Sequence, residues 1–292
     1  MRAFHLRFTL QAVHFALVEP LIQAVILGLV EGITEFLPIS STGHLILAER
    51  LIGFSDPDKT FTVVIQIGAI LAVVWFYRTD LIARVIALFT GRPNAVKFWL
   101  NLVIATIPAA VIGLGLENLL NRFESITVIA TALIVGGVLL WWLEQVRGRQ
   151  LTGQESTEVD IDSITPRQAL LIGFAQTLAV IFPGTSRSGA SIVGGWLVGL
   201  NRVTATAFSF YLGLPTLGLA GLYKLYKARD ALSSLPGGAP ALLVGTLVSG
   251  VSAFLVVGWL LRYVSRNDFK GFAIYRVIVG AVILGMVAFG WL

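Results

Sequence analysis

Cysteine is absent from this chain of 292 residues, and charged residues make up only 13% of it. The lack of cysteine excludes disulfide bonds and thiolate catalysis. The scarcity of charge excludes an ordinary soluble domain, in which about 25% of residues are charged. Hydrophobic residues account for 56% of the chain, and its mean hydropathy is +0.85. The sequence therefore predicts an integral membrane protein.

Apolar runs of spanning length fill most of the chain. They cover residues 61–77, 98–116, 126–143, 205–222, 240–261 and 272–292. Each is close to the ~20 residues that a helix needs to cross the hydrocarbon core. The net charge of +5 lies mainly in short connections, where Lys and Arg set topology, so it does not indicate nucleic acid binding. The sequence predicts an all-α polytopic protein with a single membrane domain, 20–292, and an N-terminal interfacial extension, 1–19.

The two halves of the chain share a pattern of residues. Gln23–Gly28 aligns with Gln168–Gly173, and the register continues without gaps. It places Pro38 on Pro183 and Ser41 on Ser186, and at nearly the same offset Ile134–Val138 matches Ile278–Val282. Each half, about 20–145 and about 165–292, is one broken apolar segment followed by three spans. Because an odd number of crossings reverses the second half, we expect two inverted-topology repeats, each beginning with a re-entrant helical hairpin.

The distribution of Lys and Arg predicts the orientation. These residues gather in the connections 78–97, 147–167 and 262–270, which share one side if each half has three spans. The positive-inside rule makes that side cytoplasmic, although the basic residues of 224–229 fall on the opposite side. The first hairpin is then expected to enter from the outer face and the second from the cytoplasm.

The first broken segment carries ionisable groups at a depth where they are costly and usually functional. Glu31 and Glu35 are four residues apart and share one face of a helix. Such a pair indicates a divalent metal, Mg²⁺ or Ca²⁺, with a shared proton or hydrogen bonds to neighbouring helices as alternatives. Hydroxyls at 40–42 can cap a new helix, and His44 can share a face with Ser41. Ser41 and His44 are therefore a candidate nucleophile and base, or His44 attacks directly.

A second polar insert, Pro183–Gly189, interrupts the matching apolar segment of the other half. Arg187 offers a fork of donors that suits phosphate oxygens. Thr185, Ser186 and Ser188 add hydroxyls at a helix start, where backbone amides also bind anions. A snorkelling arginine with capping serines is the alternative, but Arg187 lies far from either predicted helix end. Together the two inserts favour phosphoryl transfer, in which positioning and charge stabilisation carry most of the catalysis.

At these residues the chain resembles the undecaprenyl-diphosphate phosphatase family, the bacitracin-resistance type of bacterial inner-membrane enzyme. The resemblance covers about 20–292 and rests on Glu31–His44, Pro183–Ser191 and Phe61–Gln66. It implies a hydrolase that removes the terminal phosphate of undecaprenyl diphosphate, recycles the lipid carrier of cell-wall peptidoglycan synthesis, and has a pocket open toward the periplasm. The functional positions that it implies are Glu31, Glu35, Ser41, Thr42, His44, Ser186 and Arg187.

A secondary transporter or a polyprenyl-phosphate flippase is the rival hypothesis, since transporters also build midplane sites from broken helices of inverted repeats. The pairing of Ser41 with His44 favours the enzyme, because a transporter has less need of a nucleophile and a base. A lipid phosphatase with two catalytic histidines is excluded, since of three histidines only His44 lies deep in the predicted membrane region. The expected partners are the lipid diphosphate and membrane lipids. The sequence leaves open the nucleophile, the metal, the lipid chain length and homo-oligomerisation.

Overall fold

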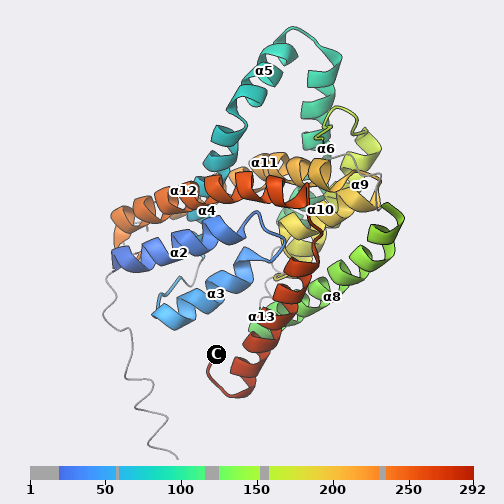
Figure 1. Ribbon diagram of the computed structural model, residues 1–292. Helices are drawn as coiled ribbons and strands as arrows, with labels where there is room; N and C mark the ends of the chain where they lie inside the picture. Colours follow the sequence, from blue (N-terminus) through green and yellow to red (C-terminus); the bar gives the residue numbers. More distant parts are fainter. Residues whose placement is uncertain (1–19, 57–58, 116–124, 152–157, 230–234) are drawn as a thin grey trace, which may run out of the picture.

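The computed structural model describes residues 20–56, 59–115, 125–151, 158–229 and 235–292, and every regular element in these ranges is an α-helix (Figure 1). The helices are α2 (Pro20–Thr34), α3 (Ser41–Ile52), α4 (Thr60–Phe76), α5 (Arg78–Phe89), α6 (Pro93–Gly115), α8 (Ile126–Leu151), α9 (Pro166–Ile181), α10 (Arg187–Leu197), α11 (Arg202–Ala228), α12 (Gly238–Val264) and α13 (Lys270–Ala288). The predicted all-α fold is confirmed. The predicted extension at 1–19 lies outside the described residues.

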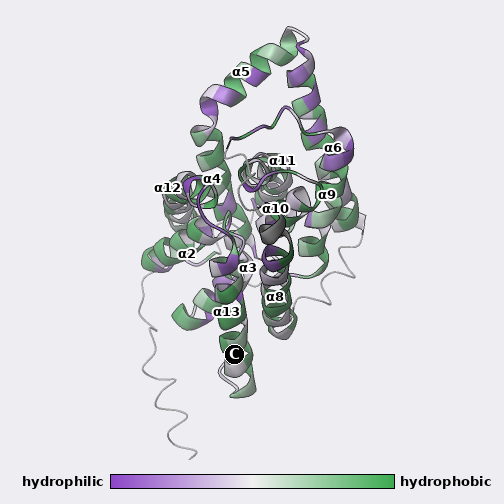
Figure 2. Ribbon diagram, turned by 45° about the vertical axis from the view of Figure 1, so that its right-hand side comes forward, coloured by the Kyte–Doolittle hydropathy of each residue, from purple (hydrophilic) through white to green (hydrophobic). Residues whose placement is uncertain are grey.

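Five helices, α6, α8, α11, α12 and α13, are long and apolar enough to cross a membrane. A sixth span results if α4 and α5 count as one, although the chain bends by 75° between them. The six predicted apolar runs coincide with α4 and these five helices. On α6 the exposed side chains recur every three or four residues, which is the spacing of one lipid-facing stripe; they are Leu100, Val103, Ile107, Val111 and Leu114. Most of the length of the long helices is green, the colour of hydrophobic residues, in Figure 2, as expected for a multi-pass membrane protein.

Two helical hairpins are present where the polar inserts predicted them. In the first, α2 packs against α3, and in the second, α9 packs against α10. The first helix of each hairpin ends a few residues before a proline, since proline lacks the backbone donor that would continue the helix. Helix α2 ends at Thr34, ahead of Pro38, and α9 ends at Ile181, ahead of Pro183. The two turns meet near the centre of the molecule, where Ser188 Oγ donates to the carbonyl of Leu37 across 2.8 Å.

The residue before the second helix of each hairpin has the same unusual backbone. Ser40 has φ 70° and Ser186 has φ 74°, in the left-handed region that non-glycine residues seldom adopt. Ser186 caps α10 by accepting a hydrogen bond from Gly189 N at 3.1 Å, whereas the side chain of Ser40 makes no capping bond. The capping prediction is thus correct for the second hairpin and wrong for the first.

Helices of one half pack against the hairpin of the other half. Helix α2 lies along α12 and α9 lies along α6, while α8 pairs with α13 and α4 with α11 and α12. Close approach depends on equivalent glycines, since a Cβ on Gly28 would lie 2.5 Å from Gly245 O, and one on Gly173 would lie 2.5 Å from Ala105 O. This exchange of hairpins accords with the aligned register of the two halves, and the inverted topology itself stays a prediction.

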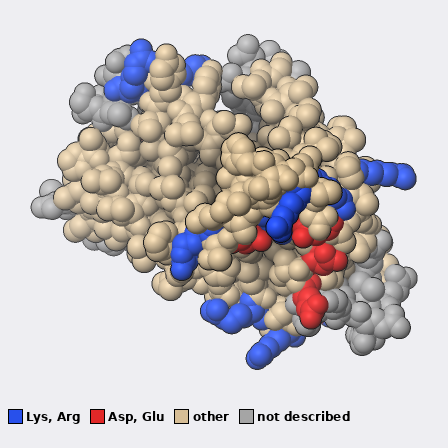
Figure 3. Space-filling model, turned by 90° about the horizontal axis from the view of Figure 1, so that it is seen from above, with Lys and Arg blue, Asp and Glu red and all other residues tan. Residues whose placement is uncertain are grey.

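A polar cluster joins α5 to the rest of the molecule. Arg84 bonds Asp80 at 2.8 Å and Asp162 at 2.6 Å, and the hydroxyl of Tyr211 donates to Asp80 at 2.6 Å. In Figure 3, which views the molecule from the α5 end, the visible acidic side chains lie together beside basic ones, other basic side chains are scattered, and most of the visible surface is uncharged. The cluster ties the bent α4–α5 segment to α11 and to the connection that precedes α9.

Candidate active site

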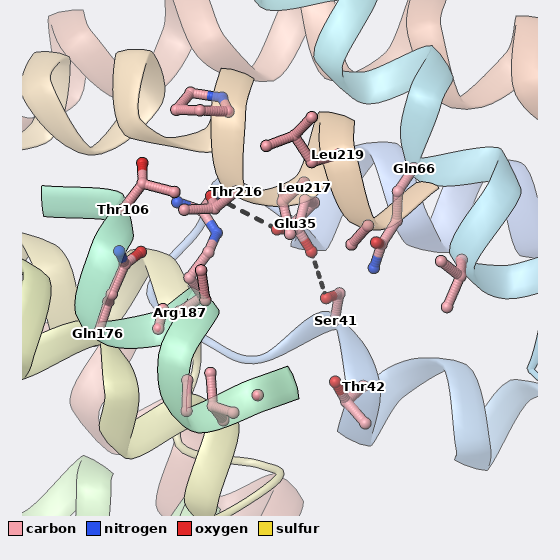
Figure 4. A pocket seen from close by; sticks show the side chains of 18 of the residues that line it. Glu35, Ser41, Thr42, Gln66, Thr106, Gln176, Arg187, Thr216, Leu217 and Leu219 are labelled. Atoms are coloured by element: carbon pink, nitrogen blue, oxygen red, sulfur yellow. Dashed lines mark hydrogen bonds and ion pairs between the residues drawn. The ribbon is translucent and has the colours of Figure 1, made fainter. Parts of the chain in front are cut away.

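A cavity of about 750 Å³ lies between the two hairpins and helices α4, α6 and α11 (Figure 4). Its wall is mostly apolar. The hairpins supply much of its polar lining, namely Glu35, Ser40, Ser41 and Thr42 from the first and Gln176, Ser186 and Arg187 from the second. An apolar cavity with a few convergent polar groups is the usual form of a small-molecule site. Both inserts contribute to one cavity.

Glu35 and Ser41 form a hydrogen-bonded pair at the first turn. Ser41 Oγ donates to Glu35 Oε2 at 2.6 Å, the length of a charge-assisted bond between a hydroxyl and a carboxylate. Local folding explains the pairing: Glu35 N still bonds Glu31 O at 2.9 Å as the helix ends, and α3 begins at Ser41 itself. The turn between them therefore brings the hydroxyl back onto the carboxylate. Glu35 is placed to accept the proton of Ser41.

Arg187 faces this pair from the second hairpin. Its Nη2 lies 3.4 Å from Glu35 Oε1, and its Nη1 donates to Ser209 O at 3.2 Å. Both side chains of the ion pair are largely buried, and Arg187 Nε has no hydrogen-bond partner among the described residues. Figure 4 shows Arg187 on one side of Glu35 and Ser41 on the other, and the unpartnered Nε leaves the arginine with donor capacity at this place. A phosphate oxygen would satisfy that capacity.

The other hydroxyls of the second insert divide into two groups. Ser186 lines the cavity and also caps α10. Ser188 is fully buried, bonds Leu37 O at 2.8 Å and lies 3.1 Å from Ser186 Oγ, so it ties the two turns together. Neither Ser188 nor Thr185 is among the residues that line the cavity. Of the three predicted phosphate-binding hydroxyls in this insert, the geometry favours Ser186.

His44 is turned away from Ser41. Its Nδ1 lies 2.7 Å from Ser40 O, and its Nε2 lies 2.8 Å from the hydroxyl of Tyr275 on α13. A carbonyl oxygen can only accept, so Nδ1 carries the proton and Nε2 accepts from the tyrosine. Both ring nitrogens are thereby used, and His44 is not among the residues that line the cavity. The spacing of Ser41 and His44 predicted a nucleophile and its base, but the structure pairs Ser41 with Glu35.

Glu31 is a buried carboxylate without a partner. Its exposed fraction is 0%, and both of its carboxylate oxygens lack a hydrogen bond among the described residues. A buried, unpaired carboxylate is strongly disfavoured unless a cation or a proton neutralises it. Together with Glu35 one turn later, it offers the hard oxygen ligands that Mg²⁺ and Ca²⁺ prefer. The described residues include no group of three or more His, Cys, Asp or Glu side chains that could hold a metal ion, so further ligands would have to be substrate oxygens or water.

Sequence reasoning missed one buried charge near the site. Arg276 lies in the middle of the apolar run 272–292 and is 2% exposed, yet the run was read only as a span. A lone arginine inside a predicted span is itself a signal of function or of specific pairing. Gln66, which ends the third stretch of the family resemblance, lines the cavity from α4.

Comparison with known proteins agrees with this geometry. Residues 24–282 match the family described as bacitracin resistance protein BacA. A protein named undecaprenyl-diphosphatase from Deinococcus radiodurans is 48% identical over 272 residues, which cover 91% of this chain and 95% of that protein. Undecaprenyl-diphosphatase 2 from Rhodospirillum rubrum is 50% identical over 267 residues, covering 90% and 94% of the two chains. Because the match spans nearly the whole membrane domain, the chain belongs to the bacitracin resistance protein BacA family.

Proposed function

We propose that this protein is a membrane phosphatase that removes the terminal phosphate of undecaprenyl diphosphate and yields undecaprenyl phosphate. The observation that carries the proposal is the hydroxyl of Ser41, bonded to Glu35 on one hairpin and faced by Arg187 from the other. The mostly apolar cavity suits a lipid substrate with a small charged head. The names of the related proteins supply the identity of the lipid.

The reaction follows from the hydrogen bond between Ser41 and Glu35. Ser41 Oγ attacks the terminal phosphorus while Glu35 accepts its proton, and the bond from that phosphorus to the bridging oxygen breaks. Undecaprenyl phosphate leaves with the proton that Glu35 took up, and a phosphoserine remains. Water then attacks the same phosphorus while the ionised Glu35 accepts its proton. The bond from phosphorus to Ser41 Oγ breaks, Glu35 returns the proton to Ser41 Oγ, and inorganic phosphate is released. Arg187, Ser186 and Thr42 hold the phosphoryl oxygens, so charge is stabilised as it develops.

Glu31 and Glu35 would hold the divalent metal, Mg²⁺ or Ca²⁺. The unpartnered oxygens of Glu31 support this part of the proposal. A bound cation would neutralise the charge of the diphosphate and of the two carboxylates. The proton transfer and the anion clamp described above use the side chains of the chain itself.

We place the protein in the bacterial inner membrane with the cavity open toward the periplasm. With the basic connections on the cytoplasmic side, the start of α4 and the ends of α6 and α11 lie at the outer face. The cavity is lined at these ends by Val63 and Gln66 on α4, Leu114 on α6, and Tyr223 and Lys224 on α11. That position would let substrate enter from the outer leaflet.

The experiment is phosphate release by the detergent-purified protein from undecaprenyl diphosphate, with and without EDTA, beside the variant Glu35→Gln. We expect release by the wild type, loss of release with EDTA, recovery on adding Mg²⁺ or Ca²⁺, and little release by the variant. Release that persists in EDTA would remove the metal from the proposal and leave the phosphatase. A folded sample that releases no phosphate with any divalent metal would overturn the phosphatase and favour the transporter.

A further inference from the structure

Arg276 on α13 is a buried cation whose hydrogen bonds within the described part of the chain all go to main-chain carbonyls. Its Nη1 donates to Pro38 O at 3.0 Å and its Nη2 to Gly184 O at 3.3 Å. Its Nη2 and Nε also donate to Ala132 O and Leu133 O of α8, each at 3.3 Å. No described carboxylate lies within ion-pair distance of this guanidinium. Since buried charges are normally paired with an opposite charge, this arrangement needs an explanation.

Two of these carbonyls occupy matching places in the turns of the two hairpins. Pro38 lies three residues before Ser41, and Gly184 lies three residues before Arg187. Ser41 and Arg187 are the first residues of α3 and α10. One guanidinium therefore holds the backbone just ahead of the hydroxyl and just ahead of the anion clamp, although the held residues are 146 positions apart in the chain, the difference between 184 and 38.

Glycines make room for the guanidinium. A Cβ on Gly136 of α8 would collide with Nη2 of Arg276, and one on Gly189 of α10 would lie 3.3 Å from its Nη1. Gly136 belongs to Ile134–Val138, one of the stretches that the two halves share, and that stretch has no part in the catalytic groups. The glycines therefore leave a space shaped for this arginine between α8 and the two turns.

We propose that Arg276 is a positioning residue, which sets the distance between Ser41 and Arg187 by holding the turns of both hairpins. This proposal rests on the proposed function, and it adds a residue that is not among those lining the cavity. The planar fork of an arginine can serve several carbonyls at fixed angles, whereas the ammonium of a lysine is a single point of donation. The proposal therefore requires arginine at this position, not merely a positive charge.

The kinetic test is the variant Arg276→Lys in the full-length protein. Because a displacement of about 1 Å in a catalytic group can cost about 100-fold in rate, we expect kcat to fall about 100-fold per folded protein, with KM within about threefold. A residue that only stabilised the fold would lower Tm and leave kcat per folded molecule unchanged. Wild-type kcat in folded Arg276→Lys overturns the proposal.

A pair of glycine variants provides a test that leaves Arg276 in place. Gly136→Ala puts a methyl group against the guanidinium, and we expect it to lower kcat at least tenfold, in the direction of Arg276→Lys. Gly285→Ala on α13 is the matched control, because nothing lies within 4 Å of a Cβ at that position. The control should retain wild-type kcat. Equal activity of the two alanine variants contradicts the role of the Gly136 space.

A distance measurement keeps this proposal separable from the phosphatase itself. The chain has no cysteine, so spin labels attached at Leu51→Cys on α3 and Leu197→Cys on α10, both exposed, report the separation of the hairpins. We expect one narrow distance distribution in the wild type and a broader or shifted one in Arg276→Lys. A changed distribution supports positioning even if the wild type releases no phosphate. An unchanged distribution overturns positioning even if the wild type is an active phosphatase.

Discussion

The two hairpins share a backbone conformation at their turns but bring opposite charges to the cavity. Ser40 has φ 70° and ψ 99°, Ser186 has φ 74° and ψ 114°, and the next residue begins a helix in both cases. That next residue is Ser41 in the first hairpin and Arg187 in the second. The same backbone conformation therefore leads into the proposed nucleophile in one hairpin and into the proposed phosphate clamp in the other. The two hairpins differ in the side chain that follows this conformation.

The carboxylates also belong to one hairpin alone. Glu31 aligns with Gln176, whose Nε2 donates to Ala105 O at 2.8 Å, and Glu35 aligns with Val180. The side-chain amide of Gln176 is neutral, and its NH₂ group already has a backbone acceptor. Unlike a buried carboxylate, it therefore needs no cation to neutralise it. The first hairpin is thus anionic and the second cationic, and the attraction between Glu35 and Arg187 joins them at 3.4 Å.

Removing the acceptor from the anionic hairpin should have the largest effect. Glu35→Gln keeps the shape of the side chain but cannot take the proton of Ser41, so we expect kcat/KM to fall about 1,000-fold. Glu49→Gln, another partly buried carboxylate on the first hairpin, is the matched control and should stay near wild type, since Glu49 does not line the cavity. Phosphate release from undecaprenyl diphosphate measures both. Equal losses would show that any carboxylate of this hairpin matters.

Replacing the guanidinium of Arg187 on the cationic hairpin should have the second largest effect. Arg187→Lys preserves the charge but not the paired donors, and we expect a loss of about 100-fold in the same assay. Arg50→Lys, at the exposed end of α3, is the control and should be silent. Near-normal turnover in Arg187→Lys would mean that a positive charge alone suffices, and it would contradict the proposal that the paired donors of Arg187 hold the phosphate.

His44 tests whether the anionic hairpin has one base or two. Its ring nitrogens bond Ser40 and Tyr275, so we expect His44→Gln to lose about tenfold or less, through a disturbed turn rather than lost proton transfer. Tyr275→Phe should cause a similar, non-additive loss. Steady-state rates for the two single variants and the double variant decide this. A collapse of His44→Gln to the level of Glu35→Gln would restore His44 as base or nucleophile.

Substitutions of one threonine in each hairpin, Thr42 and Thr185, should have the smallest effects and compare the two turns directly. Thr42 follows Ser41 and lines the cavity, whereas Thr185 of the second turn does not. We expect Thr42→Val to raise KM about three- to tenfold, the loss of one hydrogen bond of about 1 kcal/mol, and Thr185→Val to change it less than about twofold. The reverse order would place the phosphate nearer the second turn.

Much of the fold was predictable because the bilayer leaves few alternatives. Each of the six apolar runs became a helix, and the prolines at 38 and 183 follow the ends of α2 and α9. The 75° bend between α4 and α5 was not predicted, since neither proline nor glycine marks the junction of Phe76, Tyr77 and Arg78. That bend accompanies the long-range bonds of Asp80 and Arg84 with Tyr211 and Asp162, which no local pattern announces.

The site was predictable in its residues but not in its pairings. The sequence predicted Glu35, Ser41 and Arg187 as site residues. It paired Ser41 with His44, because residues three apart on a helix share a face. The actual partner, Glu35, lies across a turn, and residue spacing does not predict how a turn folds back. The gap-free register set Ser41 against Ser186, but the second turn has one more residue between its proline and its helix, so Arg187 takes the equivalent place. Arg276 donates its hydrogen bonds to main-chain carbonyls. Every residue has such a carbonyl, so the sequence does not indicate which ones an arginine will bond.

The most direct test of the central claim, that the two hairpins form one reactive unit, is a double-mutant cycle of Glu35→Gln and Arg187→Lys. The measurement is kcat/KM for terminal phosphate release from undecaprenyl diphosphate by folded wild type, both single variants and the double variant. Groups that act together are strongly non-additive, so the double variant should lose about as much as Glu35→Gln alone, about 1,000-fold. A loss equal to the product of the two single losses would contradict the claim and show that each hairpin acts independently.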